Sequence, residues 1–207
     1  MTWDEIVVDL KAQAQRMHEG REAGLAKCRS LIQTSAKSIR CLHRHQFEEA
    51  EGFLAQARKI AEEAREALKP FPELYHAGYL QDAEKEMVEA SAMAAIVGGR
   101  PYPTPAELGV GLAAYLNGMA EAASEARRYA LDELRKGSLE RAECILSQME
   151  TIYDDLITFD YPDAMTGGLR RSCDALRAVI ERTRSDLTTT AGQQDLIREL
   201  RRARGEA

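Results

Sequence analysis

The sequence has few aromatic residues and no segment patterned like a β-strand. Aromatic side chains make up 6% of the 207 residues, whereas Ala, Leu, Glu and Arg are abundant. This composition favours helices that approach closely across small side chains. No useful length of chain alternates apolar and polar residues with a period of two, so no sheet is expected. The two absences predict an all-α protein, and the length suits a single domain with a substantial core.

Paired cysteines and long apolar runs are also missing. The four cysteines lie far apart in the sequence, with neither the spacing of a zinc site nor the density of a disulfide scaffold, so we expect reduced and mostly buried thiols. No apolar run approaches the roughly 18 residues of a membrane span. The acidic start at Met1–Glu5 lacks the basic charge of a signal peptide. The sequence therefore predicts a soluble, cytoplasmic protein without a membrane partner.

The net charge of −6 argues against binding nucleic acid through overall charge, so any such site must be a local patch. One stretch, from Ala23 to Phe47, has no Asp or Glu. Within it Lys37, Arg40 and Arg44 follow helical spacing and share a face along which a phosphate backbone could lie. The spacing equally allows a solvated stripe that pairs with glutamates of the next helix. His43 is a candidate phosphate contact or surface residue, since no partner at ligand spacing supports zinc.

Helical periodicity and its interruptions predict about six or seven helices in one bundle. Prolines at 70 and 72 end one helix, the Gly98–Pro103 segment is a loop, and Thr104 with Pro105 and Glu107 is a helix start. The expected helices cover residues 2–45, 47–68, 73–97, 104–135, 138–159 and 169–187, with a short basic helix at 193–204. The predicted organisation is a helical domain over 1–187 followed by a short basic tail or helix over 188–207.

Two acidic pairs are the strongest candidates for chemistry. Glu86 and Glu89 lie three residues apart and Glu121 and Glu125 four apart, so each pair shares a helix face, and Asp82 extends the first face. Consecutive helices joined by a short loop usually pack antiparallel, which would let the four glutamates converge. Converging carboxylates must protonate or bind a cation, and oxygen ligands select magnesium or manganese.

The expected helix bounds fit this convergence imperfectly. Glu89 lies nine residues before Gly98 and Glu121 seventeen after Thr104, or roughly 13 Å and 25 Å at the helical rise per residue. The convergence therefore requires a climbing loop or different helix ends. Ordinary solvated helix positions remain the alternative, because acidic pairs at this spacing are common on helix surfaces.

The same segments resemble a known family. Glu86–Ala90, followed after one loop by Tyr115–Glu121 and then Glu125, looks like translin-associated factor X, and Ser35–Arg44 is similar to the basic segment of that family's first long helix. The resemblance spans roughly residues 35–187 and implies a translin-like fold. It lies closer to translin-associated factor X than to translin, which lacks these acids as a set.

The resemblance implies an RNA-binding protein with metal-dependent endoribonuclease activity on single-stranded RNA. In the family, the first glutamate pair and a later Asp form the metal-dependent site, which carries over to Glu86, Glu89 and Glu121 as catalytic metal ligands, with Glu125 as a fourth acid. Mg²⁺ or Mn²⁺ is the implied ion. Glu121 stands where the family usually has Asp, and one extra methylene shifts a carboxylate by roughly 1 Å.

The family also forms closed, roughly octameric shells with RNA inside, which implies a homo-oligomer with a continuous positive lining. Two other functions remain open. One is a non-catalytic RNA- or DNA-binding scaffold of the translin type, which needs the basic face and not the glutamates. The other is an all-α magnesium-dependent nucleoside-triphosphate pyrophosphohydrolase, although its second acidic pair is usually Glu-x-x-Asp rather than the Glu-x-x-x-Glu found here.

Overall fold

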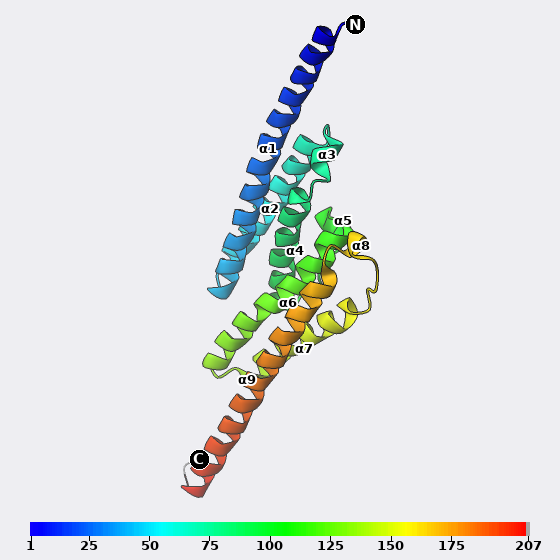
Figure 1. The fold of residues 1–207 in the computed structure, drawn as a ribbon. Helices are drawn as coiled ribbons and strands as arrows, with labels where there is room; N and C mark the ends of the chain where they lie inside the picture. Colours follow the sequence, from blue (N-terminus) through cyan, green and yellow to red (C-terminus); the bar gives the residue numbers. More distant parts are fainter. Residues whose placement is uncertain (206–207) are drawn as a thin grey trace. The chain divides into compact units, whose positions relative to one another are not determined.

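The computed structural model describes residues 1–205, and they form an all-α protein without strands (Figure 1). The sequence prediction of fold class is therefore confirmed. Six helices of this range have 18 or more residues, and three are single turns of four residues. In chain order they are α1 (Trp3–His43), α2 (Phe47–Leu68), α3 (Pro72–Tyr75), α4 (Tyr79–Gly98), α5 (Pro105–Leu108), α6 (Leu112–Arg135), α7 (Leu139–Leu156), α8 (Asp163–Thr166) and α9 (Leu169–Ala203).

The chain divides into two compact units, and the boundaries between them fall inside α4, in the loop before α5, and inside α6. Unit 1 comprises Met1–Ala90 and Thr104–Tyr115, and unit 2 comprises Ser91–Pro103 and the chain from Leu116 onward. None of the helices in residues 1–205 is both long and apolar enough to cross a lipid bilayer.

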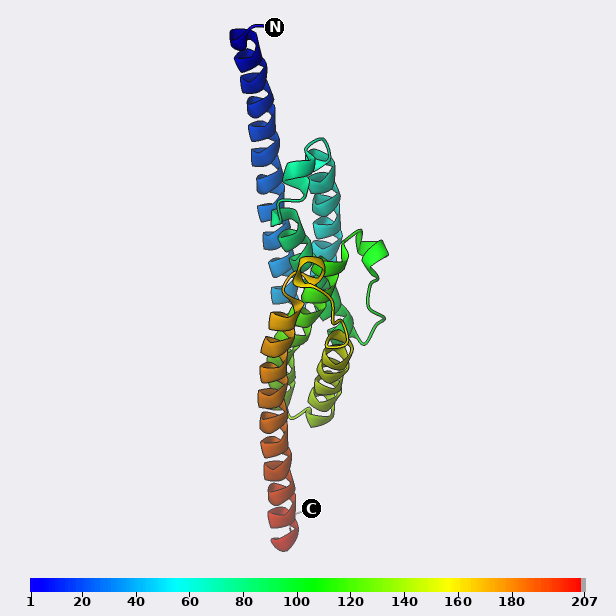
Figure 2. The same ribbon diagram turned by 45° about the vertical axis from the view of Figure 1, so that its right-hand side comes forward.

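In unit 1, α1 and α2 lie side by side as a helical hairpin (Figures 1 and 2). A capping box starts α1, in which Thr2 and Glu5 satisfy each other's backbone amides. The buried face of α2 repeats at alternating steps of four and three residues and consists mostly of alanine: Ala50, Leu54, Ala57, Ala61, Ala64 and Leu68. Small side chains at these positions allow the close approach that the composition predicted.

Two glycines of α1 lie in close contact with Leu68, the last residue of α2, and with Phe71, which follows it. A Cβ atom at Gly24 would lie 2.4 Å from Cδ2 of Leu68, and one at Gly20 would lie 2.3 Å from Cε2 of Phe71. Glycine weakens a helix, and the sequence pattern also allowed one break at these glycines in the helix expected over 2–45. The structure shows that α1 runs unbroken through both, and their missing side chains make room for the apolar partners.

The turns of α1 before Gly20 have no buried residue. They extend past the other helices of unit 1 (Figure 2) and leave apolar side chains exposed, with Trp3 at 71% and Leu10 at 50%. Burial on α1 begins at Gly24 and continues to His43.

A buried ion pair joins three segments of unit 1. Arg65 on α2 donates from Nε to Oε1 of Glu84 on α4 at 2.6 Å, and from Nη2 to the carbonyl oxygen of Leu108 on α5 at 3.0 Å. The two charged side chains are only 17% and 7% exposed. Burial raises the pKa of Glu84, whereas the hydrogen bond and the charge of Arg65 lower it.

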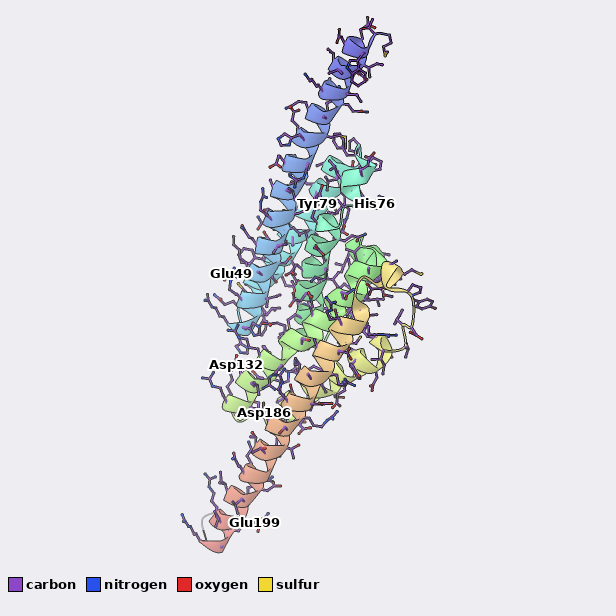
Figure 3. All side chains as sticks on the ribbon, viewed as in Figure 1. Glu49, His76, Tyr79, Asp132, Asp186 and Glu199 are labelled. Carbon is purple, nitrogen blue, oxygen red and sulfur yellow. The ribbon has the colours of Figure 1, made fainter. Side chains whose placement is uncertain are left out.

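In unit 2, α9 packs along α7 and is tied to α6 by a charged contact. Arg127 on α6 donates to Asp186 at 2.7 Å and to the Thr183 hydroxyl at 3.0 Å (Figure 3 labels Asp186). The residues of α9 buried in this unit are Leu169, Cys173, Leu176, Ile180, Thr183 and Leu187. Beyond Leu187, the last four turns or so of α9, residues 188–203, have no buried residue.

Three predicted helices differ from the observed ones, each for a local reason. The helix expected over 73–97 is divided into α3 and α4, because Gly78 between them has a φ of 97°, outside the helical region. Thr104 does form the expected capping box with Glu107, but that box starts the single turn α5, which Gly109 ends in the left-handed region at φ 66°, so α6 begins only at Leu112. The threonines at 188–190 do not end α9, because their hydroxyls donate to carbonyl oxygens four residues earlier and stay helical.

All four cysteines are free, as expected for reduced thiols, and three of them are buried: Cys28, Cys41 and Cys173. Burial, with the nearby charge of Glu84, raises the pKa of the Cys28 thiol to about 11. Such a thiol is almost entirely protonated near neutral pH, which fits a structural rather than a nucleophilic role.

Candidate functional site

The first acidic pair lies on the unit 1 part of α4. Glu86 and Glu89 are partly exposed, while their neighbours Met87, Val88 and Ala90 are buried. The apolar neighbours fix the helix by packing, so the two carboxylates project from the less buried side, about one turn apart. This arrangement agrees with the shared face inferred from their spacing.

Lys85 is a charged neighbour that the sequence reasoning missed. Its Nζ lies 3.9 Å from Oε1 of Glu86, and both side chains are partly exposed. The lysine brings a positive charge to the edge of an otherwise acidic face. Lys85 directly precedes Glu86 in the sequence, but adjacent positions on a helix do not normally face each other. The residue spacing therefore gave no reason to include Lys85 in the candidate site.

The second acidic pair lies on the unit 2 part of α6. Glu121 and Glu125 are both partly exposed, and the alanines between and after them, Ala122, Ala123 and Ala126, are buried. The four-residue spacing again places the two carboxylates on one face. Each unit thus presents one pair of carboxylates on a helix whose opposite side is held in a core.

Asn117 holds α6 in place one turn before Glu121. Its Nδ2 donates to the carbonyl oxygen of Thr166 at 2.7 Å, and its Oδ1 accepts a hydrogen bond from the Ser172 hydroxyl at 2.7 Å. The side chain is buried. It therefore joins α6 to α8 and the start of α9 within unit 2, and fixes the turn from which Glu121 projects.

Replacing Asn117 by alanine should lower the free energy of unfolding by about 2–3 kcal/mol, since two buried hydrogen bonds are lost and the Thr166 carbonyl is left without its donor. Urea denaturation followed by circular dichroism measures the change. Gln81→Ala, at an exposed position of α4, is the matched control and should cost less than about 0.5 kcal/mol. Equal effects for the two variants would show that Asn117 is not an anchor.

The predicted basic face lies on the last turns of α1. Lys37, Arg40 and Arg44 are exposed, and Lys37 lies over the ring of Phe53 with its Nζ 5.7 Å from the centroid. The sequence also allowed the basic residues of α1 to pair with glutamates of α2. Such a pair forms at Lys27, whose Nζ lies 2.6 Å from Oε2 of Glu63. Among the described residues, no ion pair engages the three cations of the face, so they remain open to a phosphate backbone.

His43 differs from the other three predicted nucleic-acid contacts in its burial. It is 9% exposed, on the side of α1 that also buries Cys41 and Leu42. An RNA contact by His43 stays a prediction, whereas the three exposed cations fit that role by their accessibility. His45, which follows the helix, has a positive φ of 58°.

The chain is similar to proteins of known structure. Two structures of AfC3PO match it, one in a complex with duplex RNA and one a separate crystal structure. In each, the identity is 36%, the TM-score is 0.84, and the match covers 90% of this chain and 97% of the AfC3PO chain. Apo-NeC3PO, at 24% identity and a TM-score of 0.81 over 92% and 98% of the chains, shares the fold. An uncharacterised protein of Methanocaldococcus jannaschii is 29% identical over 185 residues, 88% of this chain and 81% of that protein. No family model matches.

Proposed function

Because this chain belongs to the translin family and is of the translin-associated factor X type, we propose that it binds RNA and cleaves single-stranded RNA as a metal-dependent endoribonuclease. The observation that carries the proposal is the presence of both acidic pairs, each partly exposed on a helix that is buried on its other side. A relative with 36% identity has been solved with duplex RNA, which supports RNA as the ligand class.

The carboxylates suit a hard divalent cation. In this proposal Glu86, Glu89 and Glu121 are the ligands of the ion, and each offers one carboxylate oxygen. Oxygen-only ligands favour Mg²⁺ or Mn²⁺ over softer ions, and Glu125 would be the fourth acid. When bound, such an ion would supply an activated water and neutralise charge developing on the phosphate.

The observed helix bounds remove the length mismatch that the sequence suggested. Glu89 precedes Gly98, the last residue of α4, by nine residues, and Glu121 follows Leu112, the first residue of α6, also by nine residues. At equal rise per residue, the two glutamates lie at equal distances from the ends of their helices. This equality supports a shared role for the two pairs.

In this proposal some residues of the chain bind the metal ion, and others position a ligand or the RNA phosphate. Glu86, Glu89 and Glu121 hold the ion, Asn117 fixes the turn that carries Glu121, and Lys85 offers a positive charge beside Glu86 for a phosphate oxygen. Glu121 reaches about one methylene further than the Asp usual in the family, so its backbone must lie correspondingly further from the ion.

RNA binding is assigned to the basic face of α1. Replacing Arg40 and Arg44 by glutamine should weaken RNA binding about tenfold at roughly 0.1 M salt and reduce the slope of log K against log salt by about 1.5, as expected for two lost phosphate contacts. Fluorescence anisotropy over a salt series measures both quantities. Arg58→Gln/Lys59→Gln on α2 removes the same charge elsewhere and should leave the slope nearly unchanged. An unchanged slope in the α1 variant would refute the assignment.

The proposal also includes a homo-oligomeric assembly and a cytoplasmic location. Exposed apolar side chains on the outer turns of α1 and α9 support a homo-oligomer, of which a closed octamer is the expected form. Four free thiols suit the reducing cytoplasm.

A non-catalytic scaffold that binds RNA or DNA is the second candidate, favoured by one specific observation. The basic face lies on α1 and does not include the acidic pairs, so binding does not require them. The substitution of Glu121 for the usual Asp would also be tolerated by a protein that only binds.

The deciding experiment is cleavage of a labelled single-stranded RNA by the purified chain with Mg²⁺ or Mn²⁺, compared with the same reaction in EDTA. Metal-dependent cutting with a defined product pattern is the expected result. RNA binding without metal-dependent cutting would refute the nuclease and leave the scaffold.

A further inference from the structure

The turn between α1 and α2 in unit 1 carries two exposed aromatic rings. His45 follows α1 and Phe47 begins α2, and their ring centroids lie 5.7 Å apart in an edge-to-face contact. Together with Gln46, Glu48 and Glu49, the two rings line a shallow hollow of about 620 Å³. Phe47 is 46% exposed although it is a large apolar side chain. Packing within the unit therefore leaves nearly half of its surface available to a ligand.

The backbone of this turn holds His45 in an unusual conformation. Within residues 1–205, His45 is the only residue other than glycine with a positive φ, at 58°. Strained backbone of this kind is concentrated at ligand sites. The amide of His45 donates to the Leu42 carbonyl oxygen at 3.0 Å, and the amide of Gln46 donates to the Cys41 carbonyl oxygen at 2.9 Å. These two hydrogen bonds fix the turn that sets the imidazole beside Phe47.

The hollow lies at the end of the basic face of α1. Arg44, the C-cap residue of α1, directly precedes His45, and Arg40 lies one turn earlier on the helix. Both arginines are exposed. A phosphate backbone that follows this face therefore brings its next nucleotide to the two rings. Cationic side chains beside exposed aromatic rings are the combination with which proteins bind single-stranded nucleic acid.

Carboxylates inside the hollow favour a base over a phosphate. Glu48 and Glu49 are exposed acids in the first turn of α2, where Figure 3 labels Glu49. They repel a phosphate group, whereas the edge of a base offers N–H donors that a carboxylate oxygen can accept. The side chain of Gln46, which does not cap α2, can both donate to and accept from such an edge. The charges thus place the phosphates along α1 and the base in the hollow.

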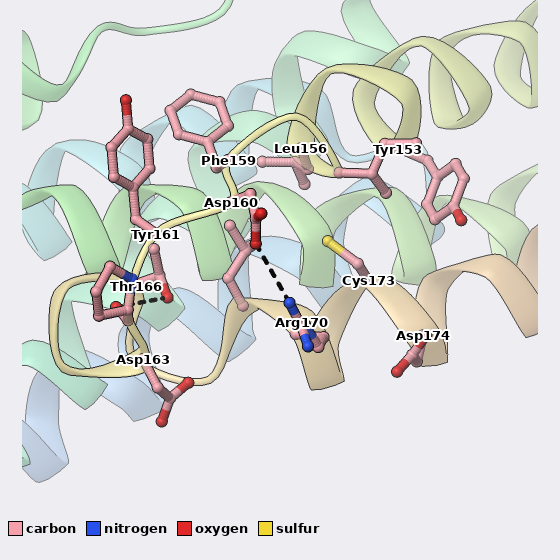
Figure 4. A pocket seen from close by; sticks show the side chains of 13 residues that line it. Tyr153, Leu156, Phe159, Asp160, Tyr161, Asp163, Thr166, Arg170, Cys173 and Asp174 are labelled. Atoms are coloured by element: carbon pink, nitrogen blue, oxygen red, sulfur yellow. Dashed lines mark hydrogen bonds and ion pairs between the residues drawn. The ribbon is translucent and has the colours of Figure 1, made fainter.

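A wide groove in unit 2 has aromatic rings but lacks this combination. Its volume is about 850 Å³, and one of its rings, Tyr161, is 58% exposed (Figure 4). Among the residues that line it, Arg170 is the one cation, and Arg170 is paired with Asp160 at 3.3 Å. Asp163 and Asp174 add further negative charge to the lining. Tyr161 is therefore an exposed ring without an available cation beside it.

We propose that the α1–α2 turn is a stacking site for one unpaired base of the bound RNA, with Phe47 as the stacking ring and His45 as its support. The proposal rests on the RNA binding of the proposed function and adds a contact to bases, which the phosphate contacts of Arg40 and Arg44 do not provide. Bases of a single strand can turn outward onto an aromatic ring, whereas bases of a duplex are already stacked and paired. The turn therefore favours single-stranded over duplex RNA.

Phe47→Leu tests the site, because leucine keeps an apolar side chain and removes the ring. Fluorescence anisotropy in EDTA, where the RNA should stay intact, measures affinity. The variant should bind single-stranded RNA about tenfold more weakly than wild type and duplex RNA within about twofold of it. Phe47→Tyr keeps the ring and should bind both RNAs like wild type. Tyr161→Leu, the matched removal of an exposed ring, should also bind like wild type.

Crosslinking locates the contact. A single-stranded RNA that contains 5-iodouridine reacts on irradiation with an aromatic ring that stacks on the modified base, and mass spectrometry identifies the peptide. The crosslink should fall on the peptide that contains His45 and Phe47, and should be lost in Phe47→Leu. Wild-type affinity for single-stranded RNA in Phe47→Leu, or an equal loss for duplex RNA or in Tyr161→Leu, overturns the stacking site only. A wild-type chain that binds no RNA overturns the proposed function as well.

Discussion

Replacing Glu86 and Glu89 together by glutamine should lower the rate of RNA cleavage by more than about 100-fold while leaving RNA affinity within about twofold of wild type. Glutamine keeps the size and one oxygen of each side chain but removes both negative charges, and a neutral amide is a weak ligand for a hard cation. Because both side chains are partly exposed, the change should not unfold α4. Single-turnover cleavage and anisotropy on one RNA measure the two quantities.

Asp82→Asn is the matched control, because this exposed acid lies one turn before Glu86 on the same helix. It should cut RNA at the wild-type rate. Cleavage by the Glu86/Glu89 variant at the wild-type rate would show that the pair holds no catalytic ion. A parallel loss in the Asp82 variant would indicate a general effect of acidic charge rather than a defined site.

Removing Arg65 should destabilise the fold by about 3–5 kcal/mol, because it leaves a buried carboxylate without its partner. Arg65→Met keeps an unbranched apolar side chain in place but loses the contacts to Glu84 and to the Leu108 carbonyl. Urea denaturation in EDTA measures the change without interference from metal. The double variant Arg65→Met/Glu84→Gln should regain part of the loss, since no buried charge remains. A single variant as stable as wild type would mean that the pair is well hydrated.

The same variant has a predicted dependence on pH. Burial, the first cause, raises the pKa of Glu84, and Arg65 opposes it. A carboxyl whose folded pKa lies above its unfolded value contributes stability at low pH that is lost as pH rises through the folded value. Without Arg65 the opposing cause disappears, so the stability of Arg65→Met should fall more steeply than that of wild type above about pH 4. Parallel profiles for the two proteins would contradict this.

Much of the fold followed from the sequence because its signals are local. The proline loop at 70–72 and the apolar periodicity on either side of it depend on residues within a few turns, and the six long helices appear near where they were expected. The start of α6 was missed because a capping box marks any helix start, and here it serves the single turn α5. The end of α9 was missed because threonine hydroxyls can either break a helix or bond within it.

The candidate site was less predictable where it depends on distant residues. The spacing of Glu86 and Glu89 was enough to place them on one face. The role of Asn117 was not visible, because its partners Thr166 and Ser172 lie 49 and 55 residues away. Likewise, no periodicity could show that Arg65 reaches both Glu84 and Leu108, or that His43 is buried while Arg40 and Arg44 are not.

The unbroken course of α1 has a thermodynamic consequence. From Gly24 onward the helix is stabilised by packing, whereas its turns before Gly20 rely on their own backbone hydrogen bonds and the Thr2 capping box. A free helix of about 15 residues is marginal in water. The outer turns should therefore open far more often than the inner ones, with amide protons that exchange early up to the contacts with Phe71 and Leu68. One continuous helix thus has two very different local stabilities, and two glycines mark the place where they meet.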